Sequence, residues 1–77
     1  MRAKAIVPLL VELARRLKAL REEKSLTLQE VYDTTGVHVG RIESNKLNLT
    51  ITTLDTLCRY YDITLSDLLL GIESVLA

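Results

Sequence analysis

Apolar residues recur every three or four positions along most of the chain, and this spacing is typical of one face of an α-helix. The first such stretch follows Pro8, which suits the first turn of a helix because its missing N–H group is not needed there. Its apolar positions are Leu10, Leu13, Leu17 and Leu20. The pattern predicts a long amphipathic helix that reaches about Lys24. Its solvent-facing side is expected to carry Arg15, Arg16, Lys18 and Arg21.

Two short helices are predicted next, at about 28–33 and 36–44. Thr27 stands before the first of them and Glu30 follows three residues later, which is the arrangement of a capping box. Three successive capping residues, D-T-T, precede the second short helix, and we take Thr35 as its cap. Two short helices joined by a tight turn describe a helix-turn-helix motif.

The predicted third helix has one apolar side and one small, cation-bearing side. Val39 and Ile42 point in the same direction and form the apolar stripe. The opposite side carries Val37, Gly40, Arg41 and Ser44, with Gly36 and His38 on the flanks. Gly40 in mid-helix costs roughly 1 kcal/mol against alanine, so we expect it to allow close approach, either of a DNA groove or of a neighbouring helix. Asn45 is expected to end the helix, because asparagine tolerates the left-handed conformation.

Two further helices complete the predicted arrangement. Thr50 is the expected cap of the fourth helix. Its apolar stripe consists of Ile51, Leu54, Leu57, Cys58 and Tyr61. Thr64 and Asp67 have the spacing of another capping box, which opens a fifth helix that extends to Leu70. Gly71 ends or kinks this helix. The residues beyond it form an apolar tail with Ile72, Val75 and Leu76.

Composition agrees with one small helical domain. The chain is 48% hydrophobic, and it contains neither Trp nor Phe. We therefore predict a single compact all-α domain of five helices over residues 1–77, with its core at about 10–70. The lone Cys58 excludes an intramolecular disulfide, and its place on an apolar stripe predicts a small core residue in a cytoplasmic protein. No apolar run approaches the length of a membrane span.

Few residues could support catalysis. One His, one Cys, the lack of a phosphate-binding Gly loop and the lack of paired carboxylates in an evident pocket argue against an enzyme, a cofactor or a metal site. The charge distribution is more informative. Net charge is zero, but residues 1–50 hold nine Lys/Arg against six Asp/Glu, whereas residues 51–77 hold one against four. A domain polarised in this way can present a basic face to phosphates.

Four segments follow one another over about residues 13–69. They read R-L-K-A-L-R-E-E-K-S-L-T, G-R-I-E-S-N-K, N-L-T-I-T-T-L and Y-D-I-T-L-S-D-L-L. Together they resemble the lambda-repressor-like, or Cro/XRE-type, helix-turn-helix family. The resemblance implies five helices, binding to double-stranded DNA as a homodimer, and control of transcription. The chain departs from the usual pattern in being about three residues shorter before the third helix. It also has Leu28, Asn45 and Leu49 where Gln, Gly and Pro are common.

On this resemblance, the third helix enters the major groove as a recognition helix. Arg41 is the candidate for reading guanine, because a guanidinium can pair with O6 and N7 together, and Val37 is the candidate for contacting a thymine methyl group. The other candidates for the base-facing side are Thr35, Gly36, His38, Gly40 and Ser44. His38 fits a packing role equally well. The candidates for phosphate contact are Gln29, Asn45, Lys46 and Asn48.

The resemblance also implies an internal role for Glu43. Phosphate would repel this carboxylate if it pointed toward DNA. In family members the equivalent glutamate pairs with an arginine of the first helix, which here is Arg21. We therefore predict an Arg21–Glu43 ion pair that holds the first and third helices together.

Apolar residues at both ends leave a second interpretation open. Ile6, Leu9 and Leu10, with the C-terminal tail, either pack on their own domain or are buried by a second copy in a two-fold dimer. A protein-interaction module, such as an antitoxin bound to a toxin or a partner of RNA polymerase, would show no salt-dependent affinity for DNA. Among DNA-binding proteins, an autonomous repressor, an antitoxin and a controller of a restriction–modification operon all agree with the sequence.

Overall fold

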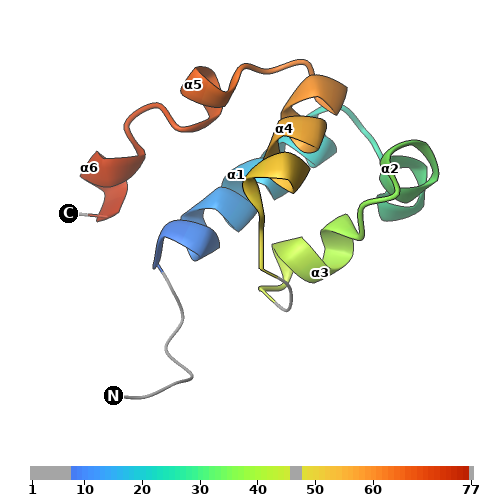
Figure 1. The fold of residues 1–77 in the computed structure, drawn as a ribbon, viewed down its shortest axis with the longest axis horizontal. Helices are drawn as coiled ribbons and strands as arrows, with labels where there is room; N and C mark the ends of the chain where they lie inside the picture. Colours follow the sequence, from blue (N-terminus) through green and yellow to red (C-terminus); the bar gives the residue numbers. More distant parts are fainter. Residues whose placement is uncertain (1–7, 46–47, 77) are drawn as a thin grey trace.

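The computed structural model describes residues 8–45 and 48–76, and within these ranges every regular element is an α-helix. The helices are α1 (Pro8–Glu23), α2 (Leu28–Thr35), α3 (Val39–Glu43), α4 (Ile51–Tyr60), α5 (Leu65–Leu68) and α6 (Ile72–Leu76). The predicted all-α class is confirmed, and the expected apolar tail forms the short α6. Helices α2 and α3 lie toward one end of the longest axis, and α5 and α6 lie toward the other (Figure 1).

Capping residues and left-handed turns set the helix boundaries. Before α2, α4 and α5, a threonine hydroxyl accepts a hydrogen bond from the backbone N–H three residues later. These threonines are Thr27, Thr50 and Thr64. Before α2 the capping box is complete, because the Glu30 carboxylate also accepts a hydrogen bond from the Thr27 N–H at 2.8 Å. Positive φ angles turn the chain after α1, α3 and α4, at Ser25, Asn45 and Asp62.

One apolar cluster joins all six helices. Its buried members are Leu13, Leu17, Val31, Val39, Ile42, Leu54, Leu57, Cys58, Tyr61, Leu68 and Ile72. Burial raises the pKa of the Cys58 thiol, which keeps the group neutral in the core position predicted for it. Ile51 departs from the predicted α4 stripe. It is 69% exposed and is the first residue of its helix.

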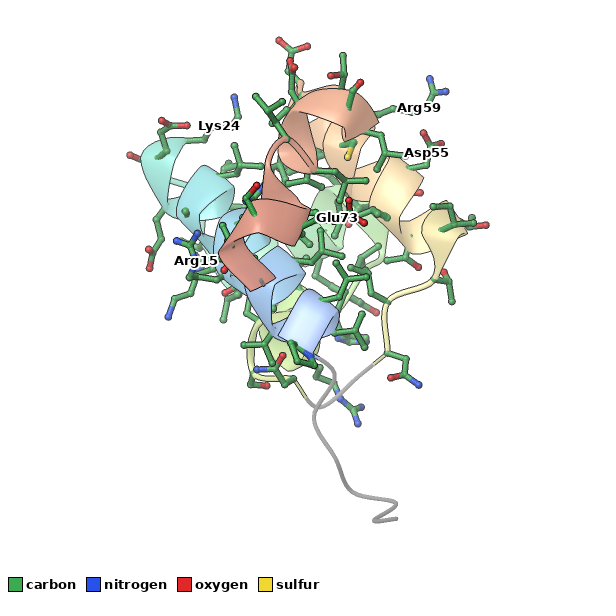
Figure 2. All side chains as sticks on the ribbon, turned by 90° about the vertical axis from the view of Figure 1, so that its left-hand side faces the viewer. Arg15, Lys24, Asp55, Arg59 and Glu73 are labelled. Carbon is green, nitrogen blue, oxygen red and sulfur yellow. The ribbon has the colours of Figure 1, made fainter. Side chains whose placement is uncertain are left out.

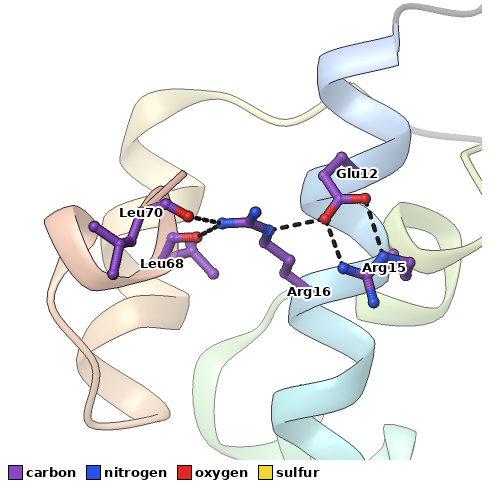
Figure 3. A network of polar contacts seen from close by, with 5 residues as sticks. All are labelled: Glu12, Arg15, Arg16, Leu68 and Leu70. Atoms are coloured by element: carbon purple, nitrogen blue, oxygen red, sulfur yellow. Dashed lines mark hydrogen bonds and ion pairs between the residues drawn. The ribbon is translucent and has the colours of Figure 1, made fainter. Parts of the chain in front are cut away.

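Arg16 connects α1 to the C-terminal segment, although it was predicted to face solvent (Figure 3). Its Nη1 donates hydrogen bonds to the carbonyl oxygens of Leu68 and Leu70, both at 2.8 Å. Its Nε donates to Glu12 Oε2 at 2.9 Å. Hydrogen bonds from Arg15 and Arg16 lower the pKa of the Glu12 carboxyl to about 2. The network therefore fastens the segment between α5 and α6 to α1.

Charged side chains surround the apolar cluster on the outside of the molecule. In Figure 2, Arg15 and Lys24 lie on one side, and Asp55 and Arg59 of α4 lie on the other. Arg59 Nε and Asp55 Oδ2 are 3.0 Å apart in an exposed ion pair. Because the charges of this ion pair cancel, the acidic excess of residues 51–77 comes from Asp62, Asp67 and Glu73. The polarity predicted from the sequence is thus carried mainly by α5, α6 and the turn before α5.

Candidate nucleic-acid interface

The turn between α2 and α3 differs from the predicted one. Helix α2 continues to Thr35, and Gly36 caps it with a φ of +73° and a backbone hydrogen bond to the Tyr32 carbonyl. Helix α3 begins at Val39 after His38, so it has five residues and does not span 36–44. The segment D-T-T forms the last turn of α2, because a glycine in the left-handed region ends the helix only after these residues.

Two predicted base-facing residues turn toward the protein. The Thr35 hydroxyl donates to the Val31 carbonyl at 2.8 Å and accepts from the Val37 N–H at 3.1 Å. Val37 is partly buried and packs against the apolar cluster. The predictions that Thr35 caps α3 and that Val37 lies opposite the apolar stripe are therefore wrong. The helical wheel does not place Val37, because residues 36–38 are not helical. Thr35 belongs to the last turn of α2 and therefore does not cap α3.

Helix α3 itself has the predicted two-sided character. Val39 and Ile42 are 2% and 3% exposed, and they anchor the helix in the core. Arg41 is exposed, on the other side. Within the part of the chain that the structure describes, no carboxylate forms an ion pair with its guanidinium. Arg41 is thus available for an external partner.

A shallow hollow lies between α2 and the start of α3. Its lining residues are Leu28, Gln29, Tyr32, His38, Val39, Gly40 and Arg41. The rings of Tyr32 and His38 stack across the two elements, with their centroids 4.4 Å apart and 28° between their planes. A Cβ atom on Gly40 would lie 3.4 Å from Leu28 Cδ1. Of the two explanations for Gly40, close approach of a neighbouring helix is therefore the one that the contacts support.

Of the residues predicted to contact phosphate, Gln29 lies in the first turn of α2, and Asn45 and Asn48 lie between α3 and α4. Those exposed in the structure are Gln29, Asn45 and Asn48. The Gln29 amide donates to Asp33 Oδ1 at 2.7 Å, along the same face of α2. Ser44 is also exposed, and its hydroxyl donates to the Gly40 carbonyl at 2.9 Å. Lys46 lies outside the described residues.

The ion pair implied by the resemblance is present and largely buried. Arg21 Nε and Nη2 donate to the two carboxylate oxygens of Glu43 at 2.8 and 3.0 Å. A third donor, Nη1, reaches the Leu26 carbonyl at 2.8 Å. The hydrogen bonds to Glu43 raise the pKa of Arg21, and the two side chains are only 12% and 8% exposed. This arrangement locks the end of α3 to α1 and to the loop before α2.

Leu28 and Tyr32 belong to this surface but were not among the predicted site residues. Both are large side chains on α2, exposed to 45% and 40%. Helix α2 has eight residues and buries only Val31 among them. No local signal separated Leu28 and Tyr32 from core residues, because positions 28, 31 and 32 have the i, i+3, i+4 spacing of a single apolar face.

Metal binding and membrane insertion receive no support from the described residues. No group of three or more His, Cys, Asp or Glu side chains is arranged there to hold a metal ion. Within the same ranges, none of the helices combines the length and the apolar character needed to cross a bilayer.

Comparison with known proteins bears directly on the α2–α3 motif. A family model described as helix-turn-helix matches residues 17–68, which is more than half of the chain. No curated protein matches the chain, and no solved structure does. The matched range contains α2, the turn, α3 and both residues of the Arg21–Glu43 pair. The chain belongs to the lambda-repressor-like, Cro/XRE-type helix-turn-helix family of DNA-binding regulatory domains.

Proposed function

We propose that the chain is a sequence-specific regulator of transcription that binds double-stranded DNA and acts as a homodimeric repressor. The observation that carries this proposal is the exposure of Arg41 on a helix whose other face is anchored by Val39 and Ile42. In this family of motifs, such a helix enters the major groove with its N-terminal part against the base edges. Arg41 then pairs with O6 and N7 of one guanine.

Phosphate contacts set the register of α3 in the groove. Gln29 lies in the first turn of the eight-residue α2, where backbone N–H groups and a polar side chain can face a phosphate together. Asn45, Lys46 and Asn48 follow α3 in sequence, so they contact the backbone on the other side of the groove. Because the Arg21–Glu43 pair ties α3 to α1, the angle of the recognition helix follows the body of the domain.

Substitution of Arg41 separates base reading from general affinity. Arg41→Ala is expected to weaken binding to a selected duplex by about 1–3 kcal/mol and to relax the preference at one base pair. Lys46→Ala is expected to weaken binding to all duplexes equally and to lower the salt slope by about one. Fluorescence anisotropy with selected and random duplexes over a salt series measures both effects. Identical behaviour of the two variants on both duplexes would contradict this assignment of roles.

The homodimer is proposed because one short recognition helix reads too few base pairs for tight specific binding, and a two-fold pair reads two half-sites. A surface for the second copy is an apolar hollow of about 740 Å³ on α1, α4 and α6. Its apolar lining includes Leu9, Leu10, Ile51, Leu54, Leu69 and Ile72. Ile6, which was also predicted to take part, lies outside the described residues.

A protein-interaction module is the second candidate, and one observation favours it. Of the described residues that line the α2–α3 hollow, Arg41 is the only Lys or Arg. Two carboxylates, Glu30 and Asp33, are exposed on the same α2. A module of this kind, such as an antitoxin or a partner of RNA polymerase, should show no salt-dependent affinity for duplex DNA. A repressor should lose affinity steeply between about 50 and about 200 mM salt.

A further inference from the structure

One exposed apolar residue that shares the α2–α3 hollow with Arg41 belongs to α2 and not to α3. Leu28, the first residue of α2, is 45% exposed and lines the same hollow as Arg41. The first helical residue of a capped helix is easily left in water, so exposure alone says little. The Leu28 side chain, however, points across to α3 instead of away from it.

Gly40 makes this approach possible. A Cβ atom on Gly40 would lie 3.4 and 3.8 Å from the two terminal methyl carbons of Leu28. The methyl groups therefore lie within van der Waals contact of the place that a Cβ atom of residue 40 would take on the outer side of α3. Gly40 directly precedes Arg41, so an apolar group lies against α3 one residue before Arg41, in the hollow that Leu28 and Arg41 both line.

We propose that Leu28 reads a thymine methyl group at the base pair adjacent to the guanine read by Arg41. This inference rests on the proposed function. The thymine C5-methyl group projects into the major groove, and apolar side chains discriminate in its favour. Val37, the residue first expected to do this, packs against the core. Among the exposed residues that line the hollow in the described part of the chain, Leu28 is the aliphatic one, since the others are Gln29, Tyr32, His38 and Arg41.

The test uses uracil, which pairs as thymine does but lacks the methyl group. Duplexes are first selected from a random pool with the full chain, and each thymine of the selected half-site is then replaced singly by uracil. For the unmodified protein, one replacement next to the guanine that responds to Arg41→Ala should reduce affinity about fourfold, the value of one buried methyl group. For Leu28→Ala, thymine and uracil at that position should bind equally well.

The chain provides a matched control in Leu65. Leu65 is also the first residue of a helix, also follows a threonine cap, and is 37% exposed, but it lies on α5. Leu65→Ala should retain the full thymine preference. Leu28→Met, which keeps an apolar side chain, should retain most of it and guards against a general loss of structure.

The outcomes separate the two proposals. If the unmodified protein binds no duplex in a salt-dependent manner, the proposed function fails, and Leu28 has nothing to read. If it binds a selected duplex but no uracil replacement lowers affinity, or if Leu28→Ala keeps the same preference as the unmodified protein, the role of Leu28 is refuted while DNA binding stands.

Discussion

Gly36 and Gly40 lie four residues apart in one motif, and different physical factors restrict the residue type at the two positions. Gly36 has a φ of +73°, a conformation that side chains with a Cβ atom adopt only at a cost. Gly40 is helical, and its backbone places no such restriction on the residue. What limits position 40 is the Leu28 side chain, whose nearest methyl carbon is 3.4 Å from the site of a Cβ atom.

The two glycines should therefore respond oppositely to alanine. Gly36→Ala is expected to lower the free energy of unfolding by about 1–2 kcal/mol, because the residue must stay left-handed. Gly40→Ala is expected to raise it by up to about 1 kcal/mol, because alanine favours the helix and the flexible end of Leu28 can shift slightly. Urea unfolding followed by circular dichroism measures both variants. A loss of stability in Gly40→Ala similar to that in Gly36→Ala would show that the contact with Leu28 is rigid.

Among the elements, α5 and α6 depend on contacts outside themselves. They have four and five residues, and helices of this length are not stable alone. Buried Leu68 and Ile72 hold their apolar sides, and Arg16 holds the carbonyl groups between them. Glu12 keeps the Arg16 side chain in place from within α1. The C-terminal segment is therefore held to α1 by one guanidinium in addition to its buried apolar side chains.

This arrangement predicts a dependence of stability on pH. The pKa of Glu12 is lowered from 4.5 to about 2 in the fold, so the ionised carboxylate stabilises the fold above about pH 4.5. That contribution should be lost progressively as pH falls from 4.5 toward 2. Glu12→Gln should be less stable than the unmodified protein at pH 7, and the difference should shrink at pH 3. Urea unfolding at both pH values measures this.

Glu23→Gln provides the control for the loss of one negative charge, since Glu23 is exposed on the same helix. A difference between Glu12→Gln and the unmodified protein that stays constant between pH 7 and pH 3 would contradict the proposed stabilisation by the carboxylate.

At the scale of the whole molecule, the proposed reading surface on α2 and α3 and the apolar hollow on α1, α4 and α6 are formed by different helices. Of the helices that line the hollow, α6 lies at the end of the long axis opposite to α2 and α3, and α1 and α4 lie between the two ends (Figure 1). The principal extents are 38 × 25 × 21 Å. In the proposed dimer, the α3 helices of both copies stay free to meet DNA. Half-sites about 34–36 Å apart are the spacing that two-fold helix-turn-helix dimers require.

Self-association should depend on the hollow and not on exposed apolar residues in general. Ile51→Lys places a charge in the hollow at a residue that is 69% exposed, so it should convert dimers to monomers without unfolding the domain. Leu70→Lys, at a side chain that is 75% exposed but does not line the hollow, should leave dimers intact. Sedimentation velocity at micromolar concentration measures the states. A monomeric unmodified protein at that concentration would remove the dimer proposal.

Local signals were sufficient for much of this fold. The apolar spacing of α1, the three threonine caps and the buried Val39 and Ile42 follow from sequence patterns with a single physical reading. The Arg21–Glu43 pair came from the family resemblance, because the partners lie 22 residues apart and no local pattern links them.

Other features had no unambiguous signal. D-T-T and Gly36 can start a helix or finish one, and which outcome holds depends on how α2 packs. The partners of Arg16 are backbone carbonyls 52 and 54 residues away, and carbonyl groups are the same in every residue. The position of Leu28 over Gly40 requires the angle between two helices, which the order of residues does not specify.

The brevity of α3 limits how much information one copy can extract from DNA. Five residues at a rise of 1.5 Å give an axis of about 7.5 Å, so the helix spans roughly two base-pair steps. Base sequences this short recur by chance throughout a chromosome, even when two of them are combined at fixed spacing. On the proposed function, an operator for this chain should therefore carry repeated copies of the short sequence, or a flexible intervening sequence that adds discrimination through the energy of bending.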